Sequence, residues 1–167
     1  MRIIFFIATI APFVMIGQPS ENAINRVMTK INILRSSGCQ CGNEKLSPVG
    51  PVQWDDQLYA VSKQYAKYMH RHNHFEHLSK NGEDLGDRLD RYGYKWHKIG
   101  ENLGYGYDDF NEVLKAWIES PSHCRMLMDP DVTHMGLSKK GTYWVQSFAR
   151  PESSISYGLR KLSYDKL

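Results

Sequence analysis

The chain has 167 residues, which is long enough for one domain with a buried core. Its hydrophobic content of 41% and charged content of 23% are those of an ordinary globular domain. The net charge of only +3, with basic and acidic residues interspersed, argues against a nucleic-acid-binding protein.

The N-terminus has the pattern of a signal peptide. Arg2 supplies a positive start, and residues 3–17 are apolar apart from one threonine and one proline. This run is short for a membrane span, which needs about 20 apolar residues. We therefore expect a signal peptide over residues 1–17 and no stable membrane span after its removal, with an uncleaved anchor as the alternative. The product is expected to be secreted, or periplasmic in a bacterium with two membranes.

Helix signals follow in order along the chain. Ser20, Asp55 and Asp109 each precede an apolar pattern with helical spacing and are typical N-cap residues. The last of these patterns is the clearest, and Ser120-Pro121 is expected to end it. The predicted helices cover residues 23–35, 55–73, 84–91 and 110–119.

Strand signals lie between and after the helices. Residues 99–104 are predicted to form a strand, and residues 134–139 and 142–149 a hairpin joined by Lys140-Gly141. Residues 38–53, rich in glycine and proline, are predicted to be a loop. Helices followed by mixed strands and helices indicate an α+β fold with helices packed on a small antiparallel sheet. The domain is expected to span 20–150, with a mobile polar tail over 151–167.

Export changes how the three cysteines are interpreted. In an oxidising compartment a disulfide is the default, and C-x-C is a poor zinc motif. Cys124 directly follows His123, just after Ser120-Pro121 is expected to end the fourth predicted helix, and Cys39 and Cys41 lie in the long loop. We predict a disulfide between Cys41 and Cys124, with Cys39 as the second choice of partner. A bond between Cys39 and Cys41 would close a small, strained ring.

The candidate site is centred on a glycine-rich run over residues 99–107. Glu101 is the one carboxylate in this apolar run, and a buried carboxylate needs partners. Candidate partners lie upstream in a histidine-dense run ending at His77, and downstream at His123. We hypothesise that Glu101, His77 and His123 converge on one shallow cleft.

Several motifs together resemble the CAP superfamily of cysteine-rich secretory proteins, insect antigen-5 allergens and plant pathogenesis-related proteins, most of all its short bacterial branch. The motifs that carry the resemblance are Asn73-His-Phe-Glu-His-Leu-Ser79, Gly93-Tyr94, Gly100-Glu-Asn-Leu103, Trp117-Ile-Glu-Ser-Pro-Ser-His123, Met135-Gly136 and Tyr143-Trp-Val-Gln146. The resemblance implies a three-layer α-β-α sandwich and a cleft of two histidines and two glutamates. In some members that cleft binds a divalent metal, often zinc. His77, Glu101 and His123 match three of the four positions.

The fourth position departs from the family pattern. The family's second glutamate corresponds to Ser120, while a glutamate stands one residue earlier at Glu119. At about 100° per residue, Ser120 lies near Trp117 on the helix and Glu119 on the opposite, polar face. We therefore expect a site of three members, His77, Glu101 and His123, able to hold Zn²⁺ or another divalent metal, with Ser120 as a weak additional contact.

Each of these residues also has a structural interpretation. His77 is one of a run of surface histidines, Glu101 suits a structural role in a glycine-rich turn, and His123 suits a helix C-terminus. The function that the sequence favours is a non-catalytic extracellular binding module for a lipid, peptide or glycan, acting as a monomer. The alternative is a metal-dependent hydrolase using the same cleft, because two imidazoles and a carboxylate leave an open zinc position for water.

Overall fold

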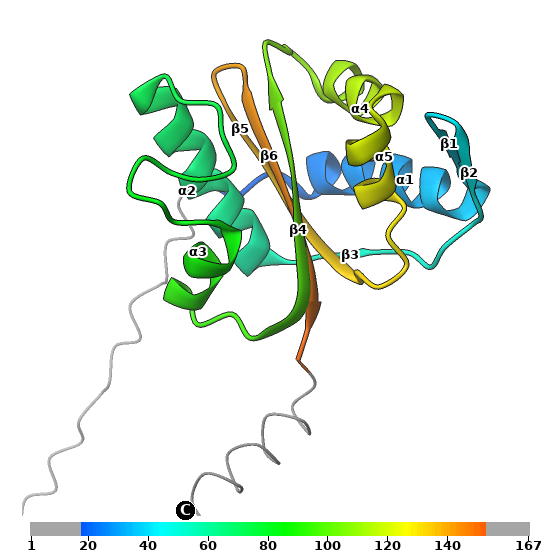
Figure 1. Cartoon of the computed structure of the whole chain (residues 1–167), viewed down its shortest axis with the longest axis horizontal. Coiled ribbons are helices and arrows are strands. Elements are labelled where there is room, and N and C mark those ends of the chain that lie inside the picture. Colours follow the sequence, from blue (N-terminus) through cyan, green and yellow to red (C-terminus); the bar gives the residue numbers. More distant parts are fainter. Residues whose placement is uncertain (1–17, 153–167) are drawn as a thin grey trace, which may run out of the picture.

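The computed structural model describes residues 18–152 and shows a sheet enclosed between two layers of helices. Figure 1 shows α2 (Asp56–His72) and α3 (Leu85–Arg91) on one face of the sheet. On the other face lie α1 (Glu21–Ser37), α4 (Phe110–Glu119) and α5 (Pro121–Leu127). The predicted three-layer α-β-α sandwich is confirmed. The signal peptide and nearly all of the tail predicted from the sequence lie outside the described residues.

The predicted caps start three of the helices. The side chain of Ser20 accepts a hydrogen bond from the backbone of Ala23, and Asp55 and Asp109 each accept two backbone N–H groups in the first turn. Each cap satisfies donors that a helix start leaves unpaired. Among the described residues, no helix has both the length and the apolar character that a membrane crossing needs.

The region around Pro121 differs from the prediction. Pro121 does end α4, but it is also the first residue of α5, a helix that the sequence analysis missed. Proline is favoured at this position because its missing N–H has no partner in a first turn. Ser120 therefore ends α4 and precedes α5, and its extended backbone separates the two helices.

The main sheet has four strands in the order β3-β5-β6-β4. Its antiparallel strands are β4 (Trp96–Tyr105), β5 (His134–Lys140) and β6 (Tyr143–Pro151), and the two-residue β3 (Gln53–Trp54) pairs in parallel with β5. The hairpin predicted around Lys140-Gly141 is confirmed as β5 and β6.

A second, two-stranded sheet occupies part of the region predicted as a loop. It pairs β1 (Cys39–Cys41) with β2 (Glu44–Leu46), so the loop prediction for residues 38–53 is wrong there. Gly42 and Asn43 form the two-residue turn of this hairpin, and Gly42 adopts the positive φ, 63°, that such a turn needs. The strands are only three residues long, too short for their alternation to stand out in the sequence.

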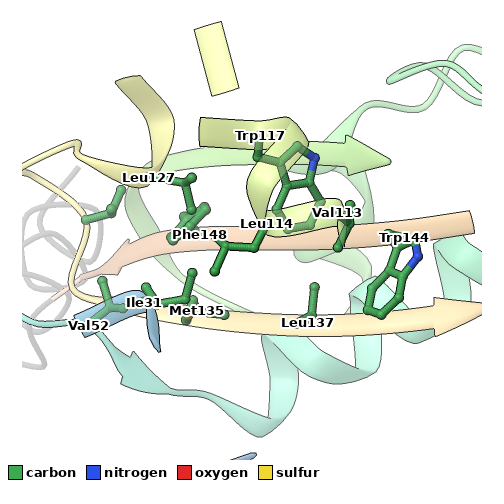
Figure 2. Close-up of a cluster of buried hydrophobic side chains, with 11 residues drawn as sticks. Ile31, Val52, Val113, Leu114, Trp117, Leu127, Met135, Leu137, Trp144 and Phe148 are labelled. Carbon is green, nitrogen blue, oxygen red and sulfur yellow. The ribbon is translucent and has the colours of Figure 1, made fainter. Parts of the chain in front are cut away.

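The larger core lies between the sheet and the layer of α1, α4 and α5. Figure 2 shows Trp117 and Leu114 of α4 above Phe148 of β6, with Ile31 of α1 close by. Because side chains alternate along a strand, Trp144 and Phe148 face this layer, whereas Val145 and Ala149 pack against α2. The sheet is thus buried on both faces.

A fully buried arginine connects α1 to the loops around it. Arg35 has no solvent exposure, and its guanidinium donates to the carbonyl oxygens of Gly50 and Leu127, both at 2.7 Å, and to those of Asp129 and Val132. Burial lowers its pKa, against an opposing effect of Asp129. The carbonyl groups replace the water that the cation has lost.

Candidate functional site

The site lies at β4, the strand at one end of the main sheet. Successive side chains of a strand point to opposite faces, so Glu101 faces the α2–α3 layer and Asn102 the α4–α5 layer. Gly100 faces the same layer as Asn102, where an added Cβ would lie 2.1 Å from the sulfur of Met126. The glycines of this run therefore allow a close approach of helices to a strand, and residues 99–105 do not form a turn.

Glu101 is almost completely buried and has two side-chain partners. Its Oε2 accepts a hydrogen bond from Nη2 of Arg88 at 2.7 Å, and its Oε1 lies 2.9 Å from Nδ1 of His77. The Glu101 and Arg88 side chains are 4% and 3% exposed, whereas that of His77 is 60% exposed. The predicted contact between Glu101 and His77 is present, at the boundary between the core and solvent.

Arg88 was missed by the sequence analysis. Its guanidinium stacks on the ring of Tyr65, 3.6 Å from the ring centre, and also donates to the carbonyl oxygens of His77 and Glu83. Its Nε is buried without a hydrogen-bond partner in the described chain. The signal was its position on α3, between Leu85 and Leu89 on the buried face. An arginine on an apolar helix face needs buried acceptors, either a carboxylate or backbone carbonyl oxygens.

The contacts of His77 determine its tautomer. Because a carboxylate only accepts hydrogen bonds, Nδ1 of His77 carries the proton that it donates to Glu101. In the neutral ring, Nε2 then keeps its lone pair. The segment that carries His77 is held by the bond from Arg88 to the His77 carbonyl and by a 2.6 Å bond from the Tyr65 hydroxyl to the Glu76 carbonyl.

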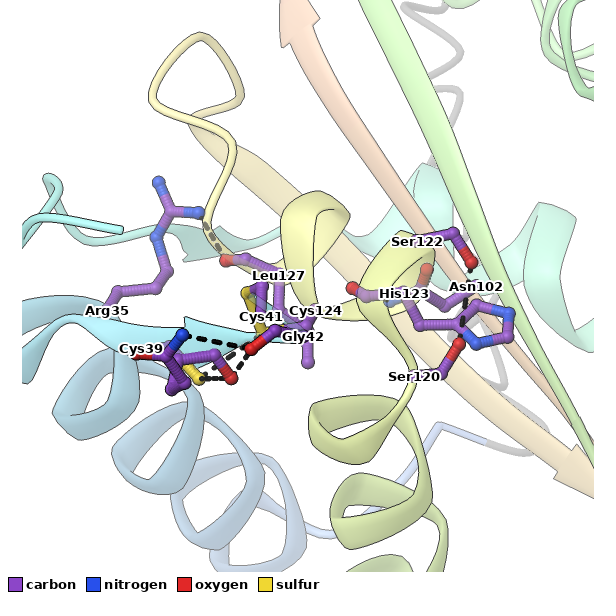
Figure 3. Close-up of a disulfide and its surroundings, with 11 residues drawn as sticks. Arg35, Cys39, Cys41, Gly42, Asn102, Ser120, Ser122, His123, Cys124 and Leu127 are labelled. Carbon is purple, nitrogen blue, oxygen red and sulfur yellow. Dashed lines mark hydrogen bonds between the residues drawn. A yellow bond between two sulfur atoms is a disulfide. The ribbon is translucent and has the colours of Figure 1, made fainter. Parts of the chain in front are cut away.

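His123 comes from the other helical layer, in the first half of α5. The Nδ2 atom of Asn102 donates to the His123 carbonyl at 3.3 Å and to Oε1 of Gln146 at 3.2 Å, so the amide supports α5 from the strand. Figure 3 shows the His123 ring beside Ser120 and Ser122. Burial lowers the pKa of His123, and the nearby charge of His77 lowers it further. The charge of His77 therefore reaches His123.

The pKa of His123 gives a testable pH dependence of stability. A folded-state pKa below the unfolded value of about 6.5 favours the neutral ring in the folded protein, so the contribution is complete above pH 6.5 and is lost as pH falls through the folded pKa. We expect the free energy of unfolding to fall between pH 7 and 5, and to fall less in His123→Gln. Denaturant unfolding at both pH values measures this. An equal fall in both proteins would contradict the assignment, and His97→Gln, at an exposed position on β4, is the matched control.

The helix-face argument for Glu119 and Ser120 agrees with the structure. Glu119 is 64% exposed and lies 3.8 Å from Lys115 on the outer face of α4. Ser120 is half-buried at the junction between α4 and α5, and its hydroxyl lies 3.4 Å from that of Ser122. Glu119 therefore points away from the site, while Ser120 remains next to His123.

The predicted metal ligands are spaced more widely than a closed metal cage. Among the described residues, the set of three potential ligand atoms that all lie within 4.8 Å of one another is formed by Cys39, Cys41 and Cys124. Two of these are joined in a disulfide, Cys41 to Cys124, as predicted. The use of His77, Glu101 and His123 as metal ligands remains a prediction.

Exposed aromatic rings lie close to His77 in the sequence and on β4. The rings of Phe75 and Tyr105 are 44% and 50% exposed, and their centres are 5.6 Å apart. The buried ring of Tyr143 lies beside that of Tyr105, tilted by 47° with the ring centres 4.6 Å apart. Phe75 is two residues before His77, and Tyr105 lies on the same face of β4 as Glu101. These rings form an aromatic patch on the α2 side of the sheet.

Comparison with solved structures shows where this architecture recurs. The fold is similar to a crystal structure of an extracellular protein containing an SCP domain from Bacillus anthracis, at 27% identity and a TM-score of 0.64, over 80% of this chain and 45% of that one. It is also similar to an outer surface protein from Borrelia burgdorferi, at 23% identity and a TM-score of 0.67, over 81% and 97% of the two chains. The second likeness shows the fold alone.

Two proteins of Bacillus subtilis are similar in sequence: uncharacterized membrane protein YlbC and uncharacterized protein YkwD. Each is 30% identical over 59% of this chain, and the match spans 29% and 39% of their lengths, so the chain corresponds to well under half of either relative. The model of the cysteine-rich secretory protein family, CAP, matches residues 28–148, which include every element from α1 to β6 at least in part. The chain therefore belongs to the CAP family, as its motifs predicted.

Proposed function

We propose that this chain is a secreted CAP-domain binding module whose cleft holds a divalent metal or a small ligand between His77 and His123. The observation that carries the proposal is the contact of His77 with Glu101, which is itself fixed by Arg88. The apolar N-terminal segment, the disulfide, and the extracellular description of the similar Bacillus anthracis protein support export.

The donor set suits a metal such as zinc. A histidine that ligates zinc almost always donates its second ring N–H to a carboxylate, a backbone carbonyl or water, and His77 donates to the carboxylate of Glu101. The lone pair on Nε2 is then the ligand. Burial lowers the pKa of His123 and so favours its neutral ring, which is the form that binds metal. In this proposal Glu101 acts through His77, and the metal ligands are the two imidazoles.

The same contacts favour binding over hydrolysis. A general base needs an accessible lone pair near the water that it activates. Both oxygens of Glu101 are occupied, one by His77 and one by Arg88, and the side chain is 4% exposed. The aromatic patch of Phe75, Tyr105 and Tyr143 is instead a surface for the apolar part of a peptide, lipid or glycan.

Titration of the purified, disulfide-intact protein with Zn²⁺ tests the proposal. We expect heat of binding in the wild type that is lost in His77→Ala and in His123→Ala, because each removes a ligand. Glu101→Gln is expected to weaken binding by about 10- to 100-fold, since it alters the group that orients His77.

His97→Ala is the matched control, because it removes an exposed imidazole from the same strand as Glu101 without touching the cleft. It should bind Zn²⁺ as the wild type does. Wild-type affinity in His77→Ala, or no heat in the wild type near neutral pH, would refute the metal site.

A further inference from the structure

The three cysteines form a compact group on the other side of α5 from the His123 ring. Cys41 and Cys124 are joined in a disulfide and fully buried, whereas Cys39 is a half-buried free thiol. The sulfur of Cys39 lies 3.3 Å from the sulfur of Cys124, and all three sulfurs lie within 4.8 Å of one another. Figure 3 shows them where β1 meets α5.

The geometry of β1 explains why both cysteines of the hairpin reach Cys124. Residues two apart on a strand point to the same face, so Cys39 and Cys41 both face α5. The hairpin also lies tightly against the first turn of α5, because a Cβ added to Gly42 would come within 2.9 Å of the Pro121 side chain. Cys124 is thus held between two possible partners.

We propose that these residues form a thiol–disulfide exchange site in which Cys124 alternates between Cys41 and Cys39. The Cys39 thiolate attacks the sulfur of Cys124, the Cys39–Cys124 bond forms, and the Cys41–Cys124 bond breaks. The electron pair leaves on the sulfur of Cys41. The proton that Cys39 gives to solvent is replaced by one that Cys41 takes up, so the step uses no external oxidant or reductant.

The cost of loop closure does not favour either partner. The two disulfides span 83 and 85 residues, and because the entropy of closure varies with the logarithm of loop length, the two closures are nearly equivalent. Local packing therefore determines the ratio of the two forms. Cys41 packs with Met128 and Cys124 in a small apolar cluster, which favours the form that the structure shows.

Two alkylating reagents distinguish the forms. A first maleimide labels the free thiol of the folded, oxidised wild type after incubation near neutral pH. After digestion with trypsin and reduction, a second reagent labels the cysteines that were bonded. Cys39 and Cys41 lie in one peptide, residues 36–45, and Cys124 in another, residues 116–125. Fragmentation of the first peptide locates each label. We expect most chains to carry the first label on Cys39 and a reproducible minority on Cys41.

Two variants that each lack one cysteine provide the matched test. Cys41→Ala should form the Cys39–Cys124 disulfide and lose free thiol, whereas Cys39→Ala should show only the Cys41–Cys124 bond and no first label. The proposal is overturned if Cys41 of the wild type never takes the first label. A folded Cys41→Ala protein in which Cys39 and Cys124 both remain open to alkylation after oxidation would also overturn it. If Cys41→Ala does not fold, the wild-type labelling decides alone.

Discussion

Arg88→Met is expected to destabilise the protein by about 3–5 kcal/mol, because it leaves the carboxylate of Glu101 buried without its cation. The guanidinium makes the 2.7 Å bond to Glu101 and holds the carbonyl groups of His77 and Glu83. Methionine retains some packing on Tyr65 but supplies no donor. Denaturant unfolding of the two proteins, followed by circular dichroism, measures the loss.

Two controls isolate the buried charge. Arg91→Met removes an arginine from the same helix, but its partner Glu83 and its own side chain are both partly exposed, so we expect a loss below about 1 kcal/mol. In the second control, Glu101→Gln is added to Arg88→Met and removes the unpaired charge. The double variant should be more stable than Arg88→Met alone. If Arg88→Met and Arg91→Met cost the same, the buried pair does not stabilise the fold.

Arg88→Met also tests the proposed metal site. Because Arg88 fixes both the carboxylate that contacts His77 and the carbonyl of His77 itself, its removal should weaken the proposed Zn²⁺ binding even in protein that remains folded. Weaker binding in Arg88→Met, at a residue outside the proposed ligand set, would show that the proposed site depends on the Arg88–Glu101 ion pair.

The parts of the fold that the sequence predicted are those with local signals. Ser20, Asp55 and Asp109 are caps whose effect is confined to one turn, and the start of each of these helices was predicted to within two residues. The hairpin β1–β2 and helix α5 were missed because each is short and is stabilised by contact with the other. Gly42 of the hairpin packs against Pro121 of α5, and the Cys41–Cys124 disulfide joins the two elements. Such contacts join residues distant in the sequence, and no local pattern encodes them.

The site was predictable in part for the same reason. A carboxylate in an apolar run requires partners, and this need pointed correctly from Glu101 to His77. It did not identify Arg88, since a cation on α3 and an anion on β4 are paired only by the packing of the layers. Asn102 supports His123 from the opposite face of β4. To predict this contact, both the alternation of side chains along β4 and the position of α5 would have to be known.

Loss of the Cys41–Cys124 disulfide is expected to have an effect as large as loss of Arg88. The bond spans 83 residues, and closure of a loop of that length stabilises by about 4 kcal/mol in the chain-entropy model. The clean comparison is between Cys39→Ala, which has this bond alone, and Cys39→Ala/Cys124→Ala, which has one cysteine and no intrachain bond. Denaturant unfolding of both variants, with a non-reducing gel to exclude dimers, gives the difference.

Cys41→Ala adds a test that links this stability to the exchange site. If Cys39 takes over the bond to Cys124, the new loop of 85 residues restores nearly all of the entropic term, and only the packing of Cys41 is lost. Cys41→Ala should then be more stable than Cys39→Ala/Cys124→Ala by most of the 4 kcal/mol that the model gives, about 3 kcal/mol or more. Equal stability of these two variants would mean that Cys39, despite lying 3.3 Å from Cys124, cannot replace Cys41.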